Sequence, residues 1–264
     1  MVTCSLGVSA LLAHQETDRP GWWLSLYPQA GEGGGCFVSS RPPQRSYVAR
    51  GRAADPERAA LEAGRRARGR LRRYCAANGL NRLGTLTYRG VGCHDPRELR
   101  GHVGEFFRDL RDGLGKDALP YLWVPEWHKT DHGLHVHFAV GQYVPRRLIE
   151  SAWGRGFVHI KLLGDLAVGS GTLEEARKAA GYLSKYVTKT FDEPSTRVLG
   201  LHRYDVAQDF QPIKVRVYGT HPDSVIEQAS EMLGAVPSRV WRSDDTEGWR
   251  GPPAIWAQWP GAHG

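Results

Sequence analysis

The sequence predicts an α+β fold in which helices pack on a central, mostly antiparallel sheet. Three observations support this prediction. In several segments apolar residues recur at spacings of three and four, the period of an amphipathic helix. Between these segments lie short runs rich in β-branched and aromatic residues, which are typical of strands. Two such runs are separated by only four polar residues, 129–132 (KTDH), which indicates an antiparallel hairpin.

The boundaries of the elements follow from helix-start pairs, prolines and glycines. Asp55–Pro56 and Asp95–Pro96 each place an N-capping aspartate before a proline at the first helical position. In chain order we expect a helix over 55–77, a strand over 82–90, a helix over 95–114, strands over 119–128 and 133–141, a helix over 145–153, a strand over 156–164, a helix over 172–190, a strand over 213–219 and a helix over 223–233.

We expect three parts along the chain. Residues 1–45 are rich in Gly and Pro and form a poorly specified N-terminal segment with one or two short strands. Residues 46–220 form the main domain, and residues 221–264 form a C-terminal helix followed by a Trp- and Pro-rich tail. We expect the tryptophans of this tail to pack against the protein rather than to stack on nucleic-acid bases.

The charge of the chain favours a polyanionic partner. The formal net charge is +7 over 264 residues, and an excess of basic residues attracts nucleic acid. Six arginines cluster on the first predicted helix and form either DNA-backbone contacts or a solvated basic face. They are Arg65, Arg66, Arg68, Arg70, Arg72 and Arg73.

The sequence also excludes some classes of protein. The four cysteines show no CxxC pair, and no apolar run is long enough to span a bilayer. The N-terminus lacks the basic region of a signal peptide. We therefore expect a cytoplasmic protein with no membrane contact. No GxxxxGK[ST] loop occurs, so no attached ATP-driven helicase is expected.

The hairpin carries a candidate metal site. Side chains alternate between the two faces of a strand, so His135 and His137 point the same way. A four-residue loop places Glu126 directly opposite His135 on the neighbouring strand. Two imidazoles and one carboxylate then converge on one patch and leave coordination positions open for a divalent ion. The same ligand set also occurs in non-haem iron oxygenases, a less favoured alternative.

The helix over 172–190 carries a candidate nucleophile. Tyr182 and Tyr186 are four residues apart and therefore lie on the same side of the helix. Lys185 and Lys189 flank them, and nearby cations stabilise a phenolate and hold a phosphate. The alternative is an amphipathic helix whose tyrosines merely border the core.

Three motifs, in this order, resemble the HUH endonucleases: residues 85–87 (TLT), 135–137 (HVH) and 182–189 (YLSKYVTK). The third is similar to the paired-tyrosine motif of rolling-circle replication initiators of phages and plasmids. The resemblance implies an HUH domain of the RRM- or ferredoxin-like type over residues 46–220. It also implies a nickase that acts on single-stranded or hairpin origin DNA, with a host helicase as partner.

The resemblance also implies roles for individual residues. His135 and His137 match the family's metal-binding pair, and Glu126 stands where a third ligand is often supplied, for Mn²⁺ or Mg²⁺. Tyr186 matches the principal nucleophile, and Tyr182 matches the second tyrosine. Two alternatives share part of this pattern: an HUH transposase or relaxase, and a noncatalytic module that binds single-stranded DNA.

Overall fold

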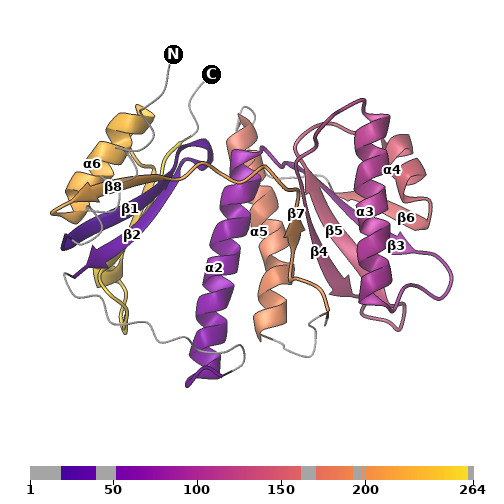
Figure 1. The fold of residues 1–264 in the computed structure, drawn as a ribbon, viewed down its shortest axis with the longest axis horizontal. Coiled ribbons are helices and arrows are strands. Elements are labelled where there is room, and N and C mark those ends of the chain that lie inside the picture. Colours follow the sequence, from indigo (N-terminus) through magenta and orange to yellow (C-terminus); the bar gives the residue numbers. More distant parts are fainter. Residues whose placement is uncertain (1–18, 40–51, 162–170, 193–197, 199, 261–264) are drawn as a thin grey trace, which may run out of the picture. The chain divides into compact units, whose positions relative to one another are not determined.

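The computed structural model describes residues 19–39, 52–161, 171–192, 198 and 200–260 (Figure 1). The chain divides into two compact units, one formed by residues 1–48 and 213–264 and the other by residues 49–212. Each unit contains a five-stranded antiparallel sheet. The predicted α+β class is confirmed, although the strands form two sheets rather than one.

The unit of residues 49–212 has helices on both faces of its sheet (Figure 1). The strand order is β6-β3-β5-β4-β7. The strands are β3 (Arg82–Tyr88), β4 (Tyr121–Trp127), β5 (Leu134–Val140), β6 (Gly156–Lys161) and β7 (Asp205–Val206). The helices are α2 (Pro56–Ala77), α3 (Pro96–Gly113), α4 (Arg146–Trp153) and α5 (Gly171–Asp192).

These bounds lie close to the predicted ones, and the expected caps explain two helix starts. The Asp55 carboxylate accepts a hydrogen bond from the Arg58 amide at 2.9 Å, and Asp95 accepts one from the Arg97 amide at 2.8 Å. Each bond satisfies an amide that the first helical turn leaves unpaired. Residues 162–164 of the strand expected over 156–164 lie outside the described residues.

Two apolar clusters, one on each face, fix which side chains of β5 point where. Val136 and Phe138 pack with α3 and α4, whereas Ala139 packs with α2 and α5. Gly84 of β3 makes this packing possible, because a Cβ there would lie 2.4 Å from the Phe138 ring. The alternation leaves the two histidines of β5 on the face covered by α2 and α5.

The other unit joins the two ends of the chain in one sheet, with strand order β8-β1-β2-β10-β9. Its elements are β1 (Gly21–Tyr27), η2 (Pro28–Ala30), β2 (Glu32–Val38), β8 (Val215–Gly219), α6 (Pro222–Leu233), β9 (Arg239–Arg242), η4 (Ser243–Asp245) and β10 (Ala254–Gln258).

This unit divides the chain differently from the three parts expected from the sequence. β8, expected within the main domain, pairs with β1, and β10 of the tail pairs with β2. Pairing between segments about 200 residues apart leaves no local signal in the sequence. The tail tryptophan Trp259 is fully buried, as its predicted packing role requires. None of the described helices has the length and apolar character needed to cross a membrane.

Candidate metal and tyrosine site

The hairpin of β4 and β5 has the register predicted from its four-residue loop. Glu126 lies opposite His135, and Trp127 lies opposite Leu134. The loop closes with a hydrogen bond of 2.8 Å from the His128 amide to the Gly133 carbonyl. Gly133 has a φ of 74°, and a Cβ there would lie 2.2 Å from the Cys93 carbonyl oxygen. Glycine is therefore required where the second strand begins.

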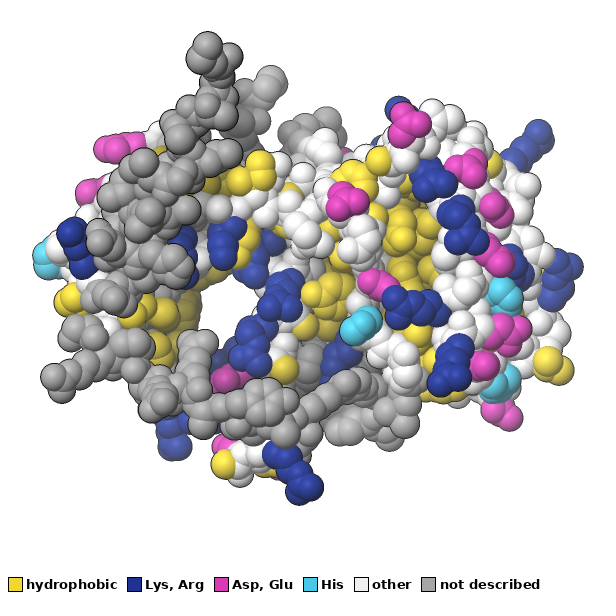
Figure 2. Space-filling view, in the orientation of Figure 1, with side chains coloured by type: hydrophobic (Ala, Val, Ile, Leu, Met, Phe, Trp, Pro, Cys, Tyr) yellow, Lys and Arg dark blue, Asp and Glu magenta, His cyan; other side chains and the backbone are white. Residues whose placement is uncertain are grey.

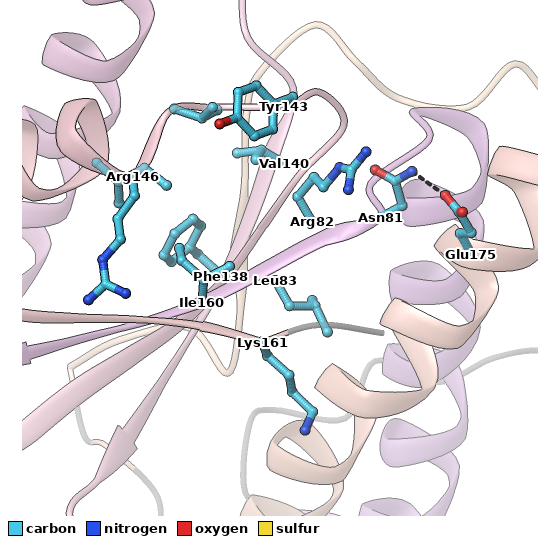
Figure 3. Close-up of a pocket in the computed structure, with 12 residues that line it drawn as sticks. Asn81, Arg82, Leu83, Phe138, Val140, Tyr143, Arg146, Ile160, Lys161 and Glu175 are labelled. Carbon is cyan, nitrogen blue, oxygen red and sulfur yellow. Dashed lines mark hydrogen bonds between the residues drawn. The ribbon is translucent and has the colours of Figure 1, made fainter. Parts of the chain in front are cut away.

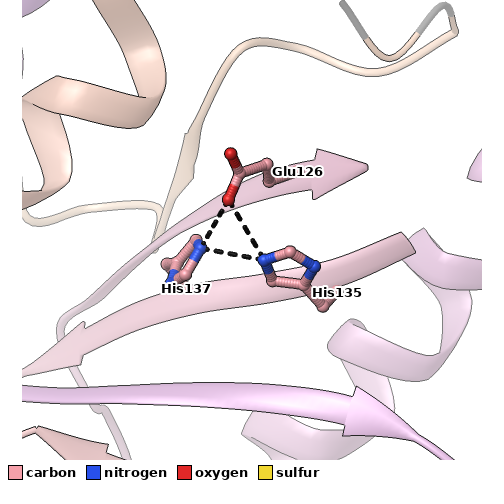
Figure 4. A group of neighbouring side chains, drawn as sticks. All are labelled: Glu126, His135 and His137. Atoms are coloured by element: carbon pink, nitrogen blue, oxygen red, sulfur yellow. Dashed lines mark hydrogen bonds and ion pairs between the residues drawn. The ribbon is translucent and has the colours of Figure 1, made fainter. Parts of the chain in front are cut away.

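The three predicted ligands meet in one cluster (Figure 4). The Oε2 atom of Glu126 lies 3.1 Å from Nε2 of His135 and 3.0 Å from Nε2 of His137. The two Nε2 atoms are 3.1 Å apart. Three donor atoms thus form a nearly equilateral triangle at the border of the buried face.

This triangle fits a divalent ion. Neighbouring ligands of an octahedral ion with bonds of about 2.1 Å stand about 3.0 Å apart. The three observed separations, 3.0 to 3.1 Å, match that spacing for one face of an octahedron. Two nitrogens and one oxygen from Glu126, His135 and His137 are a donor set that several divalent metals accept.

The ionisation of the cluster favours cation binding. Burial by itself raises the pKa of Glu126, but hydrogen bonds from His135, His137 and Lys189 hold it well below its usual range. Burial also lowers the pKa of His137, an effect that Glu126 partly opposes. At neutral pH the cluster therefore offers an ionised carboxylate and, at His137, an unprotonated Nε2.

Thr85 was quoted in the sequence only as part of the TLT motif, yet it positions a ligand. It lies opposite His137 on β3, and its Oγ1 is 3.0 Å from Nδ1 of that histidine. Because Nε2 faces the cluster, Nδ1 carries the proton and donates to the hydroxyl. Hydrogen bonds of this kind orient metal-binding histidines. The only sequence signal for it was the alternation that places Thr85 on the same face as Leu83.

Both tyrosines of α5 lie on the cluster's face of the sheet. The ring of Tyr186 stacks on the His137 imidazole, with centroids 3.7 Å apart and planes 16° apart. Its hydroxyl donates a hydrogen bond of 2.6 Å to the hydroxyl of Tyr182. The buried neighbours Leu183 and Val187 hold this side of α5 against the sheet. The structure thus brings together the two constellations that the sequence treats separately.

Residues 81–191 match a family model of replication-associated proteins, the ORF2 family. The match supports a replication-initiator family. It contains the whole cluster and both tyrosines of the site. No curated protein and no solved structure matches the chain.

The lysines take positions that differ from the expectation. Lys189 lies 3.0 Å from Oε1 of Glu126 and so pairs with a metal ligand rather than with a phenol. Lys185 stands 5.9 Å from the Tyr182 ring centroid, and Lys161 of β6, which the sequence reasoning missed, stands closer at 4.8 Å. Both ammonium groups face the ring of Tyr182.

The expected stabilisation of a phenolate at Tyr186 is wrong for the protein alone. Burial, the hydrogen bond to Tyr182 and the charge of Glu126 all raise the pKa of Tyr186 above its ordinary value. Lys189 does not offset this because its charge is paired with Glu126. Tyr186 is therefore a neutral phenol at rest.

The arginines of α2 occupy several surroundings, and Figure 2 shows basic side chains gathered along this helix. Arg65, Arg66 and Arg70 are exposed, whereas Arg68, Arg72 and Arg73 are partly buried. The Arg68 guanidinium donates to the Thr188 hydroxyl of α5 at 3.1 Å. Two of the exposed arginines border an open cavity of about 400 Å³, lined by Ala63, Arg66, Ala67, Arg70, His202, Arg203 and Tyr204.

A second cavity, of about 440 Å³, lies at the other end of β5 (Figure 3). Its lining includes Phe138 and Val140, whereas His135 stands near the start of the same strand. Lys161 borders this cavity and also contacts the Tyr182 ring. Lys161 is therefore the point at which this end of the sheet meets the tyrosine pair.

Proposed function

We propose that this protein is a replication initiator that nicks one DNA strand by attack of Tyr186 and can rejoin strands. One observation carries the proposal. The Tyr186 ring lies flat on His137, a member of the Glu126/His135/His137 cluster, so a nucleophile and a candidate metal site share one small space. The replication-initiator family match covers the same residues.

The reaction is a phosphoryl transfer through a covalent intermediate. The Tyr186 oxygen forms a bond to phosphorus while the bond from phosphorus to the 3′ oxygen breaks. The phenol proton ends on the departing oxygen. The products are a 5′-phosphotyrosine and a free 3′ hydroxyl that can prime synthesis. The phosphotyrosine bond replaces the phosphodiester, so the reverse reaction reseals the strand without ATP.

The other residues of the site hold and orient the reacting groups. Glu126, His135 and His137 would hold a divalent ion, Mn²⁺ or Mg²⁺, which supplies Lewis acidity to a phosphate oxygen. Lys189 keeps the Glu126 carboxylate in place, and the Tyr182 hydroxyl accepts the proton of Tyr186 in the resting site.

The two phenols are close enough to act in sequence. Their oxygens are 2.6 Å apart, so a phosphate within reach of one lies within reach of the other. We therefore assign Tyr182 a second strand transfer, which ends a replication cycle. The substrate is single-stranded or hairpin origin DNA, because the cluster lies under α5 and a fully paired duplex is too broad to enter. A host helicase separates the strands.

A covalent-capture experiment tests the proposal. The protein is incubated with a randomised library of single-stranded oligonucleotides in Mn²⁺, and protein–nucleotide adducts are located by mass spectrometry. We expect an adduct on Tyr186 that EDTA and Glu126→Ala abolish, with oligonucleotide binding retained. Tyr186→Phe should remove this adduct, and Tyr143→Phe, at an exposed tyrosine of the same unit, should not.

Two results would contradict the proposal. The first is a wild-type protein that binds oligonucleotides but forms no adduct in Mn²⁺ or Mg²⁺, as expected of a noncatalytic binding module. The second is strand cleavage at an undiminished rate in the double variant Tyr182→Phe/Tyr186→Phe.

A further inference from the structure

Three exposed side chains project from one face of β6, the outer strand of the sheet. They are Phe157, His159 and Lys161, which we call the β6 ledge. Phe157 is 69% exposed, although it is a large apolar residue. The intervening Val158 is buried among the side chains of α3 and α4, which fixes the ledge on the opposite face.

The ledge lies on the same face of the sheet as the metal cluster. Phe157 pairs with Thr87 of β3, and His159 pairs with Thr85. Thr85 pairs in turn with His137 of β5 and bonds to its ring. Both threonines are partly exposed, so the surface continues from the histidines to the ledge without an intervening helix.

The distance between the ledge and the site suits a flanking nucleotide. β6 and β5 are separated only by β3, so the ledge lies two strand spacings, about 10 Å, from the histidines. This distance corresponds to about three nucleotides even at the compact rise of about 3.4 Å in a duplex, and to fewer in an extended strand. At the other end of the ledge, Lys161 stands 4.8 Å from the Tyr182 ring, and Figure 3 shows its side chain extending toward α5.

We propose that the β6 ledge binds the single-stranded DNA that flanks the nick, with one unpaired base stacked on Phe157 and a phosphate held by Lys161. This inference rests on the proposed function. An exposed aromatic ring next to a cation is the combination that binds a single strand, because every base has a face that stacks and every nucleotide has a charge. A duplex offers no free base face, so the ledge selects unpaired DNA.

The test measures binding of a labelled single-stranded oligonucleotide to the full chain by fluorescence anisotropy, in EDTA so that no strand is cut. Phe157→Ala should weaken binding by about 5- to 100-fold, and Phe157→Trp should retain it. Affinity for a duplex should stay unchanged. Tyr143→Ala is the matched control, since Tyr143 is an aromatic residue of the same unit that is 72% exposed.

An abasic scan of the oligonucleotide identifies stacking directly. If one base stacks on Phe157, removing that base should eliminate the penalty of Phe157→Ala at that position and at no other. The inference is overturned if Phe157→Ala binds single strands like the wild type, or if the penalty is equal at every abasic position. These results are independent of the adduct on Tyr186, so the ledge and the nicking reaction can fail separately.

Discussion

Replacing Thr85 with valine tests whether its hydroxyl prepares His137 to bind metal. Valine keeps the shape and β-branching of threonine, so β3 should form as before, but the partner 3.0 Å from Nδ1 is lost. The His137 side chain is only 7% exposed, so water does not readily replace that partner. A buried polar atom without a hydrogen bond costs about 1–3 kcal/mol.

The expected effect on metal affinity has the same size. Losing a hydrogen bond that orients a ligand weakens metal binding by about 10- to 100-fold. This range corresponds to about 1.4–2.8 kcal/mol at 25 °C, close to the cost of leaving Nδ1 unpaired. We therefore expect Thr85→Val to raise the dissociation constant for Mn²⁺ by one to two orders of magnitude.

Calorimetric titration with Mn²⁺ measures this change. Thr85→Ser keeps the hydroxyl and should retain most of the affinity. Thr87→Val is the matched control, because Thr87 lies two residues along the same strand and on the same face. An unchanged dissociation constant in Thr85→Val, or an equal loss in Thr87→Val, would refute the assigned role of the hydroxyl.

Two further predictions concern the basic helix and the pH dependence of stability. Arg66→Ala/Arg70→Ala should weaken DNA binding at all sequences and reduce the slope of log K against log salt by about 1.4–1.8, whereas Arg147→Ala, exposed on α4, should not. Because burial lowers the folded-state pKa of His137 from 6.5, stability conferred by the neutral imidazole is present above pH 6.5 and is lost as pH falls through the folded pKa. The urea midpoint in EDTA should therefore fall between pH 7.5 and 5.5, and less so in His137→Gln.

The sequence was sufficient to predict the metal cluster because its geometry is local. The alternation of side chains along a strand and the length of one loop determine where Glu126, His135 and His137 point, and the structure has that register. The helix bounds were predictable for the same reason, since Asp55 and Asp95 cap their own first turns.

The partners of these residues were not predictable, because they come from strands whose order the sequence does not encode locally. Thr85 and Lys161 reach the site only because β3 lies between β5 and β6. The pairing of β8 and β10 with the N-terminal strands is another nonlocal arrangement, which is why the expected division of the chain differs from the observed one.

Lys189 shows how one nonlocal contact changes the chemistry inferred from a helix. Tyr182, Tyr186 and Lys189 follow one another at intervals of four and three residues and share a stripe, so the sequence favours a lysine that activates a phenol. In the structure Glu126 takes that charge. Burial, Tyr182 and the charge of Glu126 then raise the pKa of Tyr186, so neutralising Glu126 lowers it. A cation at the Glu126/His135/His137 cluster therefore makes the tyrosine more reactive, which restricts attack to protein whose metal site is filled.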